Sequence, residues 1–168
     1  MSPSGDKLAS FVLNGNIDVA PSTPTCSAAS PAAVNIGTVP ASQFGGVGQP
    51  STTSQNFNIT LTCTGGQAGL TTNVFATLTD QANPANVSDT LPLTPGGATG
   101  VGIQVLHNGT VLKFGPDSSA AGNTNQWNAG TTGNGQFVIP LTARYVQTAP
   151  TITSGAANSV ATFTMSYQ

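Results

Sequence analysis

The C-terminal segment 161–167 alternates strictly between apolar and small polar side chains. Its apolar positions are Ala161, Phe163, Met165 and Tyr167. A period of two is typical of a β-strand with one buried face. The sequence ends one residue later, at Gln168, so we expect no following strand to pair with this one. An unpaired strand edge beside an apolar groove can bind a strand from another chain. The sequence therefore predicts a sandwich that accepts its final strand in trans.

Several other segments also show the pattern of short strands. Residues 57–63 alternate strictly, and residues 74–78 continue the pattern. Asn108-Gly109 lies between two apolar segments and predicts a two-residue hairpin turn. With 20 glycines and 12 prolines, no stretch of ten or more residues carries a clean helical stripe. Seven or eight short strands predict an all-β, immunoglobulin-like sandwich.

Strands and loops are also expected in the segments whose alternation is less regular. A first strand is expected over 8–19, with Phe11, Leu13 and Ile17 facing one side. Val34 and Ile36 are expected to form a short second strand. Residues 37–55 are expected to be a loop, and so are residues 115–135, which contain Trp127. The groove left by the missing strand is then lined from the first and last strands, by Phe11, Leu13, Ile17, Ala161, Phe163, Met165 and Tyr167.

Composition excludes several classes of function. Only 5% of residues are charged and the net charge is −2, so no basic surface is available for nucleic acid. No apolar run approaches the ~18 residues of a membrane span, so no membrane insertion is expected. The single histidine, His107, has no nucleophile or orienting partner near it in the sequence. No metal-ligand spacing or glycine-rich phosphate loop occurs. We expect no enzyme, no metal and no cofactor.

The two cysteines, Cys26 and Cys63, favour a disulfide over a metal site. Their separation of 37 residues is far from metal-ligand spacing. Closing such a loop stabilises a fold by about 4 kcal/mol on the chain-entropy model. A disulfide indicates an oxidising compartment, such as the periplasm or the cell exterior. Two buried free thiols are the alternative.

Four segments together resemble subunits of bacterial chaperone–usher pili. The penultimate residue of those subunits is an aromatic, and here it is Tyr167; a glycine stands fourteenth from their end, and here it is Gly155. Residues 11–26 resemble the first strand running into the first cysteine of that family. Residues 102–115 and 139–147 resemble its middle and penultimate strands.

The resemblance implies an assembly mechanism. In that family a periplasmic chaperone first lends a strand and holds the terminal carboxylate, and the N-terminal strand of a neighbouring subunit later replaces it. It also implies an outer-membrane usher as partner, and a final location outside the cell, in the fimbria. The matching C-terminal motif here is Gly155, Tyr167 and Gln168. A disulfide in the region of Cys26 and Cys63 is usual in the family.

The N-terminal residues bear on which kind of pilus subunit the chain comes from. Residues 1–8 are expected to be a tail or an interdomain linker, followed by a pilin domain over 9–168. Residues 1–10 hold one large aliphatic side chain, Leu8, and therefore do not resemble a donor strand. Residues 100–127 and 143–168 look most like the C-terminal pilin domain of a two-domain tip adhesin, which acts in cell adhesion. The alternatives are a shaft or minor pilin with its donor segment trimmed, and, in a different class, a free-standing secreted carbohydrate-binding sandwich.

Overall fold

The protein is built almost entirely from β-strands. A computed structural model describes residues 21–28 and 33–168. Within these residues one short 3-10 turn, η1 (Ala41–Gln43), is the only helical element. The strands are β1 (Thr25–Ala28), β2 (Pro50–Thr64), β3 (Thr72–Asp80), β4 (Leu91–Pro92), β5 (Val101–His107), β6 (Thr110–Val111), β7 (Trp127–Thr132), β8 (Gly135–Gln147) and β9 (Ala161–Tyr167).

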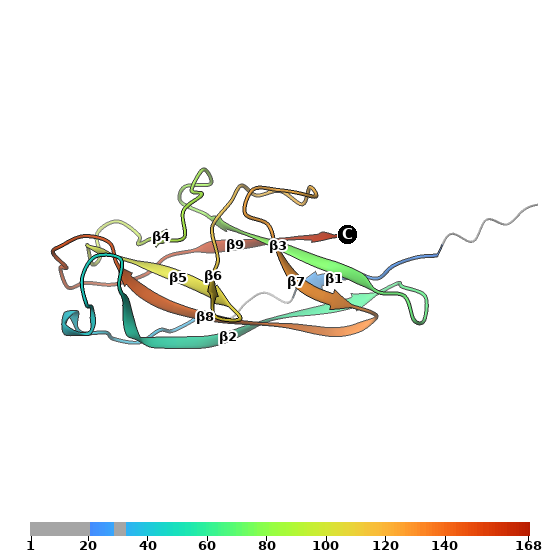
Figure 1. Ribbon diagram of the computed structural model, residues 1–168, viewed down its shortest axis with the longest axis horizontal. Coiled ribbons are helices and arrows are strands. Elements are labelled where there is room, and N and C mark those ends of the chain that lie inside the picture. The colour runs from blue at the N-terminus through green and yellow to red at the C-terminus, as the bar shows by residue number, and fades with distance from the viewer. Residues whose placement is uncertain (1–20, 29–32) are drawn as a thin grey trace, which may run out of the picture.

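The strands form two antiparallel sheets that lie face to face. The larger sheet has the order β1-β2-β8-β5-β4, with β6 paired to β5. The smaller sheet has the order β7-β3-β9. Figure 1 shows β3 and β9 lying over the layer of β2, β8 and β5. The predicted all-β sandwich is confirmed.

The long pair β2 and β8 forms the floor of the core. Its register places Ile59 opposite Ile139 and Leu61 opposite Phe137. The alternation of segment 57–63 turns Ile59, Leu61 and Cys63 inward, and none of these side chains is more than 3% exposed. They pack against Leu78 of β3 and Phe114, which follows β6. The alternating apolar positions therefore determine which face of each strand is buried.

The predicted hairpin at Asn108-Gly109 is present between β5 and β6. Both residues have positive φ angles, 50° for Asn108 and 80° for Gly109. A two-residue turn of this type needs positive φ at both central positions, which asparagine and glycine adopt at low cost. Leu106 pairs with Val111 across the turn.

Three local expectations were wrong. Val34 and Ile36 form no strand, although Ile36 is buried against Ala143 and Tyr145. Strand β2 begins at Pro50, inside the segment expected to be a loop, because ladder pairing with β8 extends it beyond the alternating residues. Trp127 begins a strand, β7, that is polar and interrupted by a bulge near Gly130. Its sequence therefore lacks a clear period of two.

Two of the predicted segments lie outside the described residues. The first strand over 8–19, with its groove residues Phe11, Leu13 and Ile17, lies outside them. So does the predicted tail or linker over 1–8.

Candidate strand-accepting groove

Strand β9 is paired along one edge. It runs antiparallel to β3, from Asp80 opposite Ala161 to Val74 opposite Tyr167. Gln168 extends this ladder, because its N–H donates to the carbonyl of Asn73 (2.9 Å) and its carbonyl accepts from the N–H of Asn73 (3.0 Å). Among residues 21–28 and 33–168, no strand pairs with the other edge of β9. Its outward N–H and C=O groups there are available to another strand.

A cavity of about 450 Å³ lies beside this edge, and we call it the groove. It is lined by β9 and segment 33–36 together with side chains of both sheets. The apolar lining includes Phe57, Leu78, Leu91, Ile103, Val105 and Phe163. Val34 and Val160 also line it, although 37% and 56% of their surfaces are exposed. Apolar side chains exposed at the entrance of an apolar cavity are typical of a surface that is covered by a partner.

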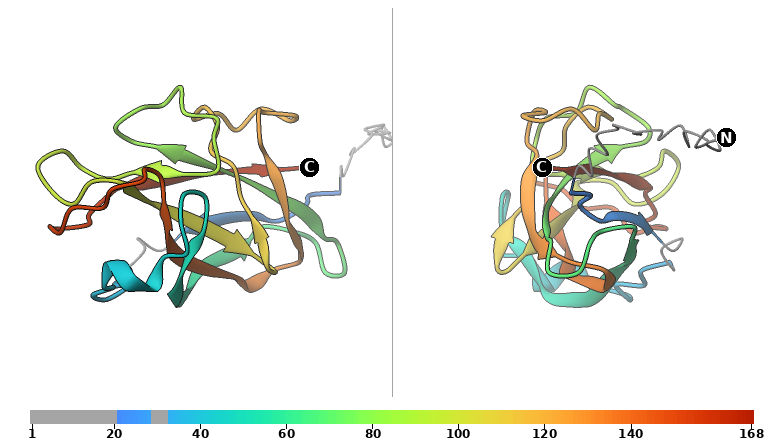
Figure 2. Two further views of the ribbon diagram at one scale, coloured as in Figure 1. Left: turned by 60° about the vertical axis from the view of Figure 1, so that its left-hand side comes forward. Right: turned by 90° about the vertical axis from the view of Figure 1, so that its right-hand side faces the viewer.

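A second cavity of about 770 Å³ continues the groove, and we call it the end pocket. It lies between segments 35–44 and 152–158 and shares Asn35, Tyr145, Ala157 and Asn158 with the groove. These two segments lie at the end of the sandwich opposite the C-terminus (Figures 1 and 2). Neither cavity is lined by a charged side chain. The two cavities together can therefore accommodate an extended, uncharged segment.

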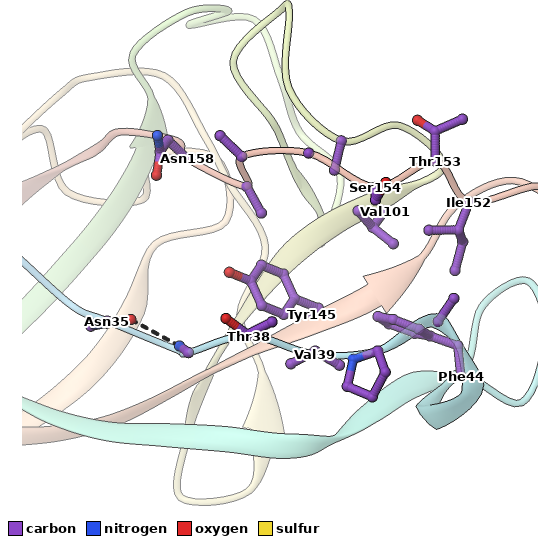
Figure 3. Close-up of a pocket in the computed structure, with 17 residues that line it drawn as sticks. Asn35, Thr38, Val39, Phe44, Val101, Tyr145, Ile152, Thr153, Ser154 and Asn158 are labelled. Carbon is purple, nitrogen blue, oxygen red and sulfur yellow. Dashed lines mark hydrogen bonds between the residues drawn. The ribbon is translucent and has the colours of Figure 1, made fainter.

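Tyr145 lies where the groove meets the end pocket. It belongs to β8, pairs with Ile103 of β5, and is 8% exposed. Figure 3 shows its hydroxyl pointing into the end pocket, between segment 35–39 and Asn158. Burial raises the pKa of Tyr145, so the hydroxyl stays protonated at neutral pH.

The structure separates the predicted residues of β9 into two groups. Ala161 and Phe163 line the groove. Met165 and Tyr167 lie further along β9 and pack against the core, and neither lines the groove or the end pocket. The pattern of the sequence did not single out Val34, Tyr145 or Val160 as groove residues. Val160, an isolated valine next to a strand end, carries no periodic signal, and Val34 was assigned to a short strand with Ile36. The spacing of Tyr145 from Leu141 and Ala143 indicated only a buried face.

Tyr167 connects the end of β9 to the opposite sheet. Its hydroxyl donates a hydrogen bond of 2.6 Å to the backbone carbonyl of Cys26 in β1. Cys26 is joined to Cys63 of β2 by a disulfide, and the two residues are directly opposite in the ladder. Burial raises the pKa of Tyr167, which keeps the phenol in the form that can donate. The C-terminal end of β9 is therefore attached to the disulfide-linked edge of the larger sheet.

The outer face of β9 is covered by the loop between β6 and β7. Thr164 of β9 donates a hydrogen bond to the carboxylate of Asp117. The side-chain amide of Gln168 donates to that of Gln126 (2.9 Å). The same loop reaches β3, where the amide of Asn123 donates to the hydroxyl of Thr77 (3.1 Å). These contacts hold β9 from outside, so that its open side is the edge next to the groove.

Gly155 lies where two loops meet backbone to backbone. A Cβ atom on this residue would lie 2.6 Å from the nitrogen of Ala98 and 2.7 Å from the carbonyl carbon of Gly97. Close by, the N–H of Ala98 donates to the carbonyl of Ala156 (2.8 Å). A glycine is therefore required for the turn at 94–100 to pack against the segment that leads into β9. Gly155 also lines the end pocket.

We expect Gly155→Ala to destabilise the protein by about 1–3 kcal/mol, because backbone atoms must move to admit the methyl group. The measurement is urea unfolding followed by the fluorescence of Trp127, the only tryptophan. Gly133→Ala is the matched control. A Cβ at Gly133 meets no atom nearer than the carbonyl oxygen of Leu70 at 3.5 Å, so we expect a change below about 0.5 kcal/mol. Equal urea midpoints for the two variants would contradict the close approach.

No candidate metal site is present among the described residues. No group of three or more histidine, cysteine, aspartate or glutamate side chains among them could hold a metal ion. A nitrogen of the His107 ring, Nδ1, lies 3.1 Å from the carbonyl of Pro140. The ring lies against Trp127, tilted by 39° with 4.7 Å between the centroids. No helix in residues 21–28 and 33–168 has the length and apolar character to cross a membrane.

Comparison with solved structures identifies the type of fold. By structure the chain is similar to the P pilus rod subunit PapA, with a TM-score of 0.61 and 23% identity over 85% of this chain and 99% of that one. It is also similar to the CupB6 tip adhesin from Pseudomonas aeruginosa, with a TM-score of 0.61 and 24% identity over 77% of this chain and 35% of that one. These two likenesses show the pilin type of immunoglobulin-like fold.

The sequence comparisons show the family to which the chain belongs. The F17c-G and F17b-G fimbrial adhesins of Escherichia coli are each 42% identical to this chain over 163 residues. Each match covers 94% of this chain and 44% of the adhesin, so the chain spans less than half the length of these relatives. The model of the family described as "Fimbrial protein" matches residues 12–168. The predicted resemblance is confirmed: the chain belongs to the fimbrial protein family, whose members are extracellular subunits of bacterial pili.

Proposed function

We propose that this chain is the strand-accepting domain of a fimbrial tip adhesin and joins that adhesin to the next pilus subunit. The single observation that carries the proposal is the open edge of β9 beside an uncharged groove of about 450 Å³. A donor strand would add main-chain hydrogen bonds along β9 and insert alternate apolar side chains between the sheets. On this proposal residues 9–168 are the pilin domain and residues 1–8 are the linker to a receptor-binding domain.

The proposed donor is the N-terminal segment of a neighbouring subunit. Before assembly, a periplasmic chaperone would occupy the same groove and bind the carboxylate of Gln168, and an outer-membrane usher would exchange the two donors. Gln168 directly follows β9, and its backbone pairs with Asn73 of β3. A chaperone strand that runs along β9 would therefore reach the carboxylate at this end of the strand.

The adhesin assignment is supported by the relatives at 42% identity, which are named as fimbrial adhesins. A shaft or minor pilin with a trimmed donor segment is the second candidate, because the fold is as similar to PapA, a rod subunit, as it is to the CupB6 tip adhesin. In both cases the domain accepts a strand. In both cases the family is one of structural subunits, and we propose no enzymatic activity.

A carbohydrate-binding function for this domain is disfavoured by the surroundings of Trp127. A sugar-binding tryptophan offers an open ring face, whereas the imidazole of His107 lies against this indole, with 4.7 Å between the ring centroids and a tilt of 39° between the planes. The rest of the side chain packs against the core. Adhesion would therefore reside in a part of the protein other than this domain.

Two valines on the surface provide the test. Val160 is 56% exposed and lines the groove, whereas Val138 is 43% exposed on β8 and lines neither cavity. We expect Val160→Asp to weaken the binding of a donor peptide at least about tenfold, because the peptide would bury an unpaired carboxylate. We expect Val138→Asp to leave the affinity within about twofold.

The probe is a synthetic peptide of about twelve residues with Val, Ile or Leu at every second position, which is long enough to follow β9 and the segment before it. Affinity is measured by fluorescence anisotropy of the labelled peptide, added during refolding of the oxidised chain. Equal affinities of both aspartate variants, or no binding of the peptide to the unsubstituted chain, would contradict the proposal.

A further inference from the structure

The path of the proposed donor strand crosses a small number of polar side chains, because Asn35, Tyr145, Asn158 and Ser159 line the groove. The interior wall of the groove is formed by apolar side chains, namely Phe57, Leu78, Leu91, Ile103, Val105 and Phe163. Ser159 also lines it, but its hydroxyl already donates to the carbonyl of Pro92 (2.7 Å). Tyr145 differs, because its hydroxyl points into the space where the groove and the end pocket meet.

Among residues 21–28 and 33–168, no residue forms a hydrogen bond with the Tyr145 hydroxyl. Among the residues that line the end pocket, the one hydrogen bond to a side chain runs from the N–H of Gly37 to Oδ1 of Asn35 (2.9 Å), and it is the dashed line in Figure 3. The Tyr145 hydroxyl forms none with them, although the side chain is more than nine-tenths buried. A phenol can donate one hydrogen bond and accept others, and the Nδ2 group of Asn35 adds further donors nearby.

A strand that covers Tyr145 must therefore replace the water that this hydroxyl can contact. An apolar side chain in that place would leave a buried hydroxyl without a partner, which weakens binding. A charged side chain would be buried without a counterion, because neither cavity is lined by a charged residue. A neutral side chain with a hydroxyl or amide avoids both penalties.

We propose that Tyr145 is a specificity-determining residue of the groove, and that the donor strand places a neutral hydrogen-bonding side chain (Ser, Thr, Asn or Gln) against it. The other inward positions of the donor are apolar. This inference rests on the proposed strand-accepting function and adds to it the class of donor that the groove prefers. The partner is thus a peptide segment that is alternating and apolar except at one inward position.

The test is a set of donor peptides in which Thr replaces Val at one inward position at a time. Thr and Val have nearly the same shape and differ in the hydroxyl. At the position that covers Tyr145 we expect the Thr peptide to bind about tenfold more tightly than the all-Val peptide. At the remaining inward positions we expect it to bind more weakly, because the hydroxyl is then buried without a partner.

The variant Tyr145→Phe removes the hydroxyl and keeps the ring. We expect the preference for Thr at that position to disappear or to reverse in this variant. Tyr167→Phe is the matched control, since the chain has two tyrosines and Tyr167 lines neither cavity. This control should retain the tenfold preference.

Three results would overturn the inference. They are the absence of a position with a preference for Thr, a preference that persists in Tyr145→Phe with both affinities unchanged, and a preference that persists while the affinities for the Thr and Val peptides fall equally. The last result would assign the hydroxyl to the donor main chain. Binding of the all-Val peptide separates these results from a failure of the proposed function, in which no peptide of the set binds.

Discussion

A donor peptide that fills the groove is expected to raise the melting temperature of the oxidised chain by about 15 °C or more. Burial of about four apolar side chains is worth on the order of 6–12 kcal/mol before the cost of association. In a domain of this size each kcal/mol shifts the melting temperature by about 2–4 °C. The free domain, with β9 open along one edge, is expected to unfold at low temperature or to aggregate.

The measurement is thermal unfolding followed by circular dichroism at increasing concentrations of the alternating peptide. The midpoint should rise with concentration, as binding to the folded state alone requires. A peptide with Asp at each inward position is the control, and it should leave the midpoint unchanged. A high, peptide-independent midpoint for a monomeric chain would show that the fold needs no donor.

Removal of the disulfide is expected to lower the stability of the chain by about 4 kcal/mol. The bond between Cys26 and Cys63 fixes β1 against β2 and closes a loop of 37 residues in the unfolded chain. The loss should extend to β9, because the Tyr167 hydroxyl donates to the carbonyl of Cys26, and a mobile β1 no longer holds that acceptor in place. The double variant Cys26→Ala/Cys63→Ala tests this by urea unfolding with the alternating peptide bound to every variant, and with the fluorescence of Trp127 as the probe.

Two control variants separate the effect of the disulfide from that of the Tyr167 hydrogen bond. Ser27→Ala, an exposed position of the same strand, should change the stability by less than about 0.5 kcal/mol. Tyr167→Phe, which removes only the hydrogen bond to Cys26, should cost about 1 kcal/mol. A double cysteine variant as stable as the unsubstituted oxidised chain would refute the structural role of the bond.

Most of the strands could be predicted from the sequence because their signal is local. Ile59 and Leu61 alternate with threonines, and such a pattern can bury one face only as a strand. Asn108-Gly109 specifies its turn through the backbone angles that these two residues tolerate. Where the local signal was weak, prediction failed. The polar β7 and the extension of β2 to Pro50 exist because a neighbouring strand supplies hydrogen bonds, and an isolated segment carries no record of its neighbour.

The residues that line the groove also divide into those that could be predicted from the sequence and those that could not. Ala161 and Phe163 were predictable as groove residues because they belong to the alternating final strand. Val160, Val34 and Tyr145 were not, because their role depends on three segments that are distant in sequence and meet at one end of the sandwich. The role of Gly155 was predicted as a family feature, and the structure supplies a physical reason, which is the close approach of the backbone at Ala98.

The sequence by itself determined the all-β character of the protein, the buried face of its main strands and the alternating final strand, because all three depend on residues that are neighbours along the chain. Only the tertiary structure decided that β9 pairs with β3 alone among the described strands, and that Tyr145 stands where the groove meets the end pocket. Strand order and cavity shape depend on contacts between distant segments, and the free energy of such contacts is a property of the packed sheets rather than of any one segment.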